Sequence, residues 1–106
     1  MTFGERMKEL MDQGLAASKE FVIKAGAKAQ DLGERGILML EIKQLEGQAQ
    51  KLITRMGNDA YVAFTEKDQS VIDREQAEFK NTLSEIALIR DAIEKKETEL
   101  RVRKPV

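Results

Sequence analysis

The stretch 71–100, VIDREQAEFKNTLSEIALIRDAIEKKETEL, decides the fold together with 42–64, IKQLEGQAQKLITRMGNDAYVAF. In the later stretch, apolar residues recur every seven positions, namely Ile72, Phe79, Ile86, Ile93 and Leu100. The earlier stretch keeps the same interval at Ile42, Ala49, Met56 and Ala63, while Leu38, Leu45 and Leu52 follow it half a heptad away. A sustained seven-residue apolar repeat is typical of helices that pack along a narrow seam.

The two stretches predict an antiparallel coiled-coil hairpin, with a helix over 37–64 packed against a helix over 71–101. Pairing residues whose numbers sum to 135 sets Ile42 beside Ile93, Ala49 beside Ile86, Met56 beside Phe79 and Ala63 beside Ile72. The same pairing places Arg35 level with Leu100. The predicted seam comprises Ile42, Leu45, Ala49, Leu52, Met56, Ala63, Ile72, Phe79, Leu83, Ile86, Ile89 and Ile93.

The polar run from Thr65 to Ser70 separates the two stretches and predicts the turn of the hairpin. Ser70, with Asp73 three residues later, resembles a capping box that would start the second helix at Val71, and Asp68 is a competing cap. Two aromatic residues near this turn, Tyr61 and Phe64, are expected to close the end of the bundle rather than to form an exposed patch.

Residues 3–32 predict an amphipathic helix with a thin apolar stripe. Apolar residues recur at intervals of three and four, but Gly14, Gly26 and several alanines dilute them. Each interior glycine costs about 0.5–1 kcal/mol relative to alanine, so this helix is expected to need a packing partner.

The glycines at 33 and 36 leave the connection to the next helix open. Gly33 suits a helix C-cap after Leu32, which would turn the chain back. A new helix that starts afterwards lacks a Ser, Thr, Asp or Asn cap and has only Gly36 in that position. The alternative is that the chain does not turn and continues as one helix into Ile37. The segment 33–36 is therefore either a hinge or part of one long helix.

The apolar surface is wider than a two-helix seam needs. Residues 37–40 (Ile-Leu-Met-Leu) place apolar side chains on every side of one helical turn, and Leu88 and Ala92 widen the later helix. This excess predicts a further layer, supplied by 3–32 in a three-helix bundle or by a second chain in a homo-oligomeric bundle. The partner or self-association surface is expected to include Met7, Leu10, Met11, Leu15, Phe21, Val22, Leu40 and Leu88.

The composition excludes several classes of function. The 106 residues contain no cysteine and no histidine, so disulfides, thiolate metal sites and the commonest general base are absent. The net charge of −1 gives no field that would attract nucleic acid. We expect no catalytic residues, no metal, no cofactor and no nucleic-acid partner. The chain also has no signal peptide pattern and no membrane-spanning run, so a cytoplasmic location is the expectation.

The sequence resembles small bacterial coiled-coil proteins whose role is uncharacterised. The resemblance lies in the Lys/Ala-rich stretch 24–29, the segment 37–46 (ILMLEIKQLE) and the segment 57–61 (GNDAY) before the turn. Longer members of that group append a zinc ribbon, which this chain lacks because it has no cysteine. The resemblance implies a helical hairpin and transfers no activity and no site.

These observations predict a non-enzymatic helical scaffold or adaptor that acts through protein–protein interaction and self-associates. One alternative is a peripheral membrane protein that inserts the apolar side chains of 3–32. Residues 1–36 carry six basic and six acidic side chains, however, so attraction to anionic lipid should be weak. A second alternative is a small helical chaperone for a secreted client.

Overall fold

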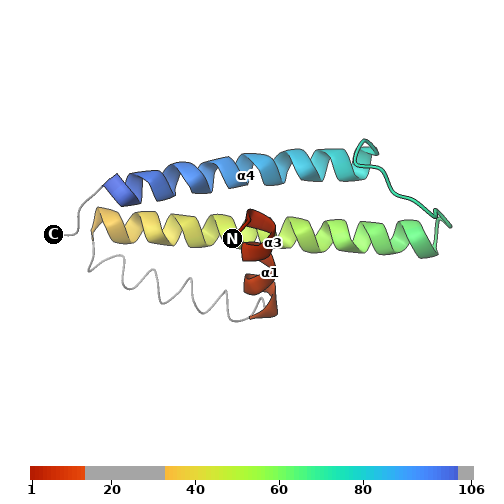
Figure 1. Ribbon diagram of the computed structural model, residues 1–106, viewed down its shortest axis with the longest axis horizontal. Helices are drawn as coiled ribbons and strands as arrows, with labels where there is room; N and C mark the ends of the chain where they lie inside the picture. The colour runs from red at the N-terminus through yellow and green to blue at the C-terminus, as the bar shows by residue number, and fades with distance from the viewer. Residues whose placement is uncertain (14–32, 103–106) are drawn as a thin grey trace.

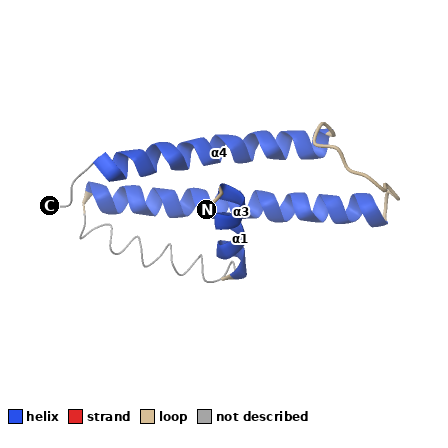
Figure 2. Ribbon diagram, in the orientation of Figure 1, coloured by secondary structure: helices blue, strands red, loops and turns tan. Residues whose placement is uncertain are grey.

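A computed structural model describes residues 1–13 and 33–102, and these ranges contain three helices and no strand. They are α1 (Phe3–Asp12), α3 (Glu34–Thr65) and α4 (Ala77–Val102). Figure 1 shows α3 and α4 running antiparallel along their length, with α1 lying across the middle of α3. Figure 2 shows that the connection between α3 and α4 is a loop. The all-α hairpin predicted from the heptads is confirmed.

Polar contacts between α3 and α4 fix how the two helices are aligned. Arg35 Nη1 donates a hydrogen bond of 2.7 Å to the carbonyl oxygen of Leu100, the pair that the register places level. Lys96 pairs with Glu41 a turn further along. The contact between Arg35 and Leu100 agrees with the predicted register, and the pair between Lys96 and Glu41 lies within two positions of it.

The predicted seam is buried most deeply at a few of its positions. Ile42, Ala49, Ala63, Phe79 and Ile93 are buried, while Leu45, Leu52, Met56, Ile72, Ile86 and Ile89 are half-buried. Leu83 is a correction, because its side chain is 38% exposed and the neighbouring Thr82 is buried instead. The Thr82 hydroxyl accepts from Arg55 Nη2 at 3.1 Å and donates to the carbonyl oxygen of Glu78 at 2.9 Å, so it enters the interface without an unpaired polar group.

The second helix begins at Ala77, so the predicted start at Val71 is wrong. A turn at 73–76 precedes α4, in which Asp73 Oδ1 accepts from the backbone N–H of Glu75 at 2.9 Å. The Gln76 side-chain oxygen accepts from the backbone N–H of Asp73 at 2.8 Å. Asp73 accepts from the residue two positions later, as in an Asx turn, and not from the third as in a capping box, so these bonds shape the turn that leads into α4. Asp68 is not a helix cap either, since its φ of +53° bends the chain within the loop.

The backbone is not helical at Gly33, so the helix that contains Ile37 does not continue back through this glycine. Gly33 has φ +64° and ψ −139°, a conformation that glycine adopts readily and that a continuous helix does not contain. Gly33 occupies the N-cap position of α3, which the sequence pattern assigned to Gly36. Consequently α3 begins at Glu34, slightly before the predicted 37, and ends at Thr65.

At its N-terminus α1 carries a complete capping box of its own. The Thr2 hydroxyl oxygen accepts from the Glu5 backbone N–H at 3.1 Å, and the Glu5 carboxylate accepts from the Thr2 backbone N–H at 3.3 Å. The α1 helix ends at Asp12, so it covers only the first part of the helix predicted over 3–32. Asp12 is unfavourable in a last turn that has no basic residue, and Gly14 follows in the sequence. The remainder, 14–32, lies outside the described residues.

Replacing a buried seam residue should destabilise the hairpin far more than replacing an exposed one on the same helix. Ile93 is 1% exposed, whereas Leu88 is 71% exposed. We expect Ile93→Ala to lower the free energy of unfolding by about 2–4 kcal/mol, because it removes buried methylenes and leaves a cavity. The matched variant Leu88→Ala should change it by about 0.5 kcal/mol or less. Chemical denaturation followed by circular dichroism measures both, and equal losses would contradict the seam.

Candidate interaction surface

One face of α3 holds α1 at its middle and is open beyond it. Glu46, Gln50, Ile53, Gly57 and Ala60 alternate at spacings of four and three, so they lie along one side of the helix. Glu46 and Gln50 are buried, whereas Ile53 and Ala60 are half-buried and Gly57 is exposed. This face therefore has a covered part and an open part, which are described in turn.

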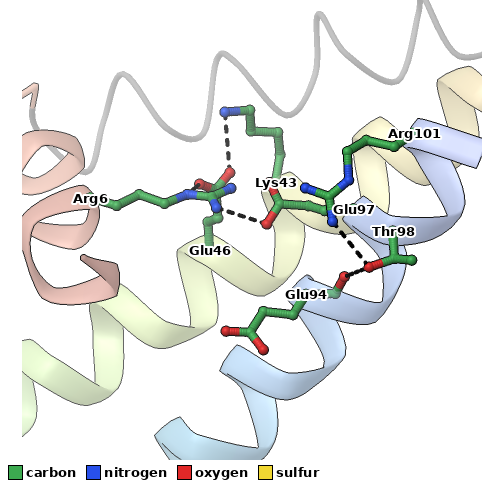
Figure 3. A network of polar contacts seen from close by, with 7 residues as sticks. All are labelled: Arg6, Lys43, Glu46, Glu94, Glu97, Thr98 and Arg101. Atoms are coloured by element: carbon green, nitrogen blue, oxygen red, sulfur yellow. Dashed lines mark hydrogen bonds and ion pairs between the residues drawn. The ribbon is translucent and has the colours of Figure 1, made fainter. Parts of the chain in front are cut away.

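Arg6 joins all three helices through one guanidinium group (Figure 3). Its Nε donates to Glu46 Oε2 on α3 at 2.8 Å, and its Nη1 donates to Glu97 Oε1 on α4 at 2.9 Å. We call Glu46, Ile93 and Glu97 the α1 seat, because the two acids bind Arg6 and Ile93 lines the cavity between α1 and α4. The planar, forked guanidinium presents separate N–H donors in fixed directions, which suits it to two carboxylates at once.

Glu46 is a buried acid whose charge has two basic neighbours. Its side chain is 3% exposed, and Lys43 Nζ lies 3.1 Å from Oε1 on the side away from Arg6. Oε1 is buried, and the ammonium group of Lys43 compensates its charge. A buried carboxylate is tolerated only when it is paired, so α1 is held by a charge that needs a cation.

The local charges perturb the pKa of Arg6. Burial by itself lowers that pKa, but the hydrogen bond from Arg6 to Glu97 and the negative charge of Glu46 together outweigh it. The pKa of Arg6 is therefore raised above its ordinary value. The arginine stays charged at every pH at which the protein is folded, so α1 has no proton-controlled release at this residue.

Met7 is the buried apolar side chain of α1. Its side chain is 1% exposed, and Leu10 one turn later is half-buried. Met7 is therefore not available to a partner, contrary to the surface predicted from the sequence. Of the other predicted surface residues, Met11 and Leu88 are exposed and Leu40 is half-buried, while Leu15, Phe21 and Val22 lie outside the described residues.

Beyond α1, an apolar groove of about 350 Å³ opens between α3, α4 and the loop that joins them. Its lining comprises Ile53, Met56, Gly57, Ala60, Ile72, Asp73, Arg74, Phe79 and Leu83. The loop residues form one wall, because the chain between Thr65 and Ala77 is not helical and crosses this end of the hairpin. Met56 and Phe79, an expected pair of the seam, both line this groove.

Two aromatic residues are exposed on the same end of the molecule. Tyr61 is 65% exposed and Phe64 is 47% exposed, so the prediction that they close the end of the bundle is wrong. The loop begins directly after Thr65 and leaves these rings uncovered, since no helix lies over them among the described residues. The open face and this aromatic end together give the hairpin an apolar surface that a partner could cover.

Sequence reasoning identified the apolar side of this surface and missed its polar residues. The apolar repeat singles out none of Arg6, Glu46, Gln50 and Thr82, and charged and polar residues usually lie on solvated faces. The only available signal was that Arg6 directly precedes Met7, which lies in the apolar stripe of the first helix. The acids that complement Arg6 come from two other helices, and their positions depend on where α1 lies.

The described residues contain no cluster of metal ligands. No group of three or more acids, histidines or cysteines in 1–13 and 33–102 is placed to hold a metal ion. None of the helices in these ranges is both long and apolar enough to cross a membrane.

Comparisons of the chain with protein-family models, curated proteins and solved structures gave no match.

Removing the cation from the α1 seat should loosen α1 and destabilise the protein. We expect Arg6→Met to lower the free energy of unfolding by about 1–3 kcal/mol, because it leaves a buried carboxylate without its main partner. The adjacent and exposed Lys8 offers a matched control, and Lys8→Met should have little effect.

A second substitution tests whether the cost comes from the unpaired charge. Glu46→Met, added to Arg6→Met, should restore part of the lost stability, since an apolar side chain needs no cation. Hydrogen exchange of the α1 amides, measured beside chemical denaturation, separates loosening of α1 from loss of the hairpin. Additive losses in the double variant would show that the two residues do not interact.

Proposed function

We propose that this protein is a non-enzymatic helical scaffold or adaptor that acts through protein–protein contacts and associates with a second copy of itself. The observation that carries the proposal is the apolar groove between α3, α4 and their loop. It continues the face of α3 on which α1 already packs, so this face is suited to the apolar side of a helix.

The composition of the groove favours a protein partner over a small polar ligand. Seven of its nine lining residues are apolar or glycine, and the two charged ones, Asp73 and Arg74, have opposite sign. Burial of apolar area is the main driving force of association, and a groove with balanced charge does not select a charged ligand.

The overall charge supports a second copy as the occupant. The net charge is −1, so two copies do not repel each other strongly at a distance. The exposed Tyr61 and Phe64 extend the apolar surface at the groove end, and aromatic residues commonly anchor protein interfaces.

The arrangement of α1 counts against a membrane-surface role for this helix. Insertion into lipid would require Met7 to leave the hairpin, where it is buried, and would separate Arg6 from the two acids that it binds. A helix that lies on a membrane needs its apolar face free. We therefore propose that α1 is an internal packing element.

Two leucines of α4 allow a matched test of the groove. Leu83 lines the groove, whereas Leu88 is exposed outside it. We expect Leu83→Glu to weaken self-association by about tenfold or more, because it places a charge at a desolvated contact. Leu88→Glu should leave self-association near the wild-type value. Light scattering across a dilution series measures the mass, and circular dichroism checks that both variants stay helical.

The opposite outcomes are equally clear. A mass of 12.0 kDa at every concentration would contradict self-association. A larger loss with Leu88→Glu than with Leu83→Glu would move the interface to the other exposed surface of α4. Proteins that wild type captures from its native extract, and that Leu83→Glu does not capture, would identify an adaptor partner.

A further inference from the structure

The structure contains one helix-binding site whose occupant is known, the α1 seat. We propose that this seat also binds α1 of a second copy, so that Arg6 of one chain pairs with Glu46 and Glu97 of another. The inference rests on the proposed self-association and specifies one way in which two copies can be joined. In that arrangement the partner copy contributes its Arg6 to the seat, in place of the Arg6 that each chain supplies to its own seat in the structure.

The hairpin is held by contacts in which α1 takes no part. Arg35 binds the carbonyl oxygen of Leu100, and Arg55 binds the hydroxyl of Thr82. These contacts, and the pair between Lys96 and Glu41, lie between α3 and α4 alone. The seat is therefore built by two helices that are also joined to each other directly.

Departure of α1 leaves a seat that favours rebinding of an equivalent helix. The acids Glu46 and Glu97 come from different helices, and Arg6 neutralises both of them with separate nitrogen atoms. Without Arg6, two like charges remain beside the buried Ile93. The matching ligand is a short amphipathic helix with an arginine next to an apolar residue, and α1 of another copy is such a helix.

The α1 helix has the features of a transferable unit. Its N-terminal capping box, formed by Thr2 and Glu5, lies entirely within the first residues and travels with the helix. Its attachment to the hairpin depends on Arg6 and Met7, which are adjacent in sequence. Because the same contacts form within one chain or between two, protein concentration and the connecting segment decide which arrangement is populated.

Substitution of Arg6 alone cannot test the proposal, because it weakens both arrangements equally. Complementary charge reversals can. In Arg6→Glu the helix repels every unmodified seat, and in Glu46→Arg/Glu97→Arg the seat repels every unmodified α1. When the two chains are mixed, each helix finds an attractive seat only on the other chain. Both variants are full-length, and one is isotope-labelled so that native mass spectrometry distinguishes the dimers.

We expect the mixed dimer to exceed either homodimer by about tenfold or more, which corresponds to roughly 1.4 kcal/mol. A statistical mixture, or no mixed dimer, would overturn the inference. If circular dichroism shows that the doubly reversed seat is unfolded, Glu97→Arg alone replaces it, because Glu97 is 34% exposed and tolerates a larger side chain.

Leu83→Glu, introduced into both partners, separates this inference from the proposed groove interface. Mixed dimers that persist with this substitution form through the exchanged helices. Wild-type self-association that Leu83→Glu abolishes, together with absence of mixed dimers from the reversed pair, would leave the groove proposal standing and remove the exchange. A monomeric wild type without mixed dimers would remove both.

Discussion

The architecture depends on apolar burial along the line where α3 and α4 meet. Ile42, Ala49, Phe79 and Ile93 are buried there, and the polar pairs at its margin only fix the alignment of the helices. A helix in water is marginal unless one of its faces is covered, so each long helix provides what the other needs. The seat for α1 and the apolar groove both depend on this contact, because each is lined by residues of both helices.

The first helix is attached by a different kind of force. It is short, and its hold on the hairpin combines one buried apolar side chain, Met7, with a charge that binds two acids on separate helices. The arginine makes this attachment specific, because its guanidinium contacts both carboxylates when α1 lies at one position along the hairpin. Thus α3 and α4 are held together mainly by apolar packing, whereas the position of α1 is set mainly by ion pairs.

Periodicity predicted the hairpin because it indicates which residues face a neighbouring helix. The contact between Arg35 and Leu100 agrees with the pairing that it predicts. Periodicity failed where local hydrogen bonds compete. The hydrogen-bonded turn at Asp73 and Gln76 places the start of α4 later than the heptad repeat predicts. The repeat indicates which residues are buried, and it does not indicate where a helix begins. The α1 seat was beyond reach for another reason. Its charges come together only through the tertiary position of α1, which no spacing within the chain encodes.

The irregular chain between Thr65 and Ala77 has a consequence for how such a protein can change. These residues wall the groove through Ile72, Asp73 and Arg74, yet the contacts that hold α1 lie on the other half of the hairpin. Insertions or deletions here would reshape the surface offered to others while the helical zipper stays intact. The loop wall of the groove and the contacts that hold α1 are thereby encoded in separate stretches, and a lineage could diversify that wall without altering the hold on α1.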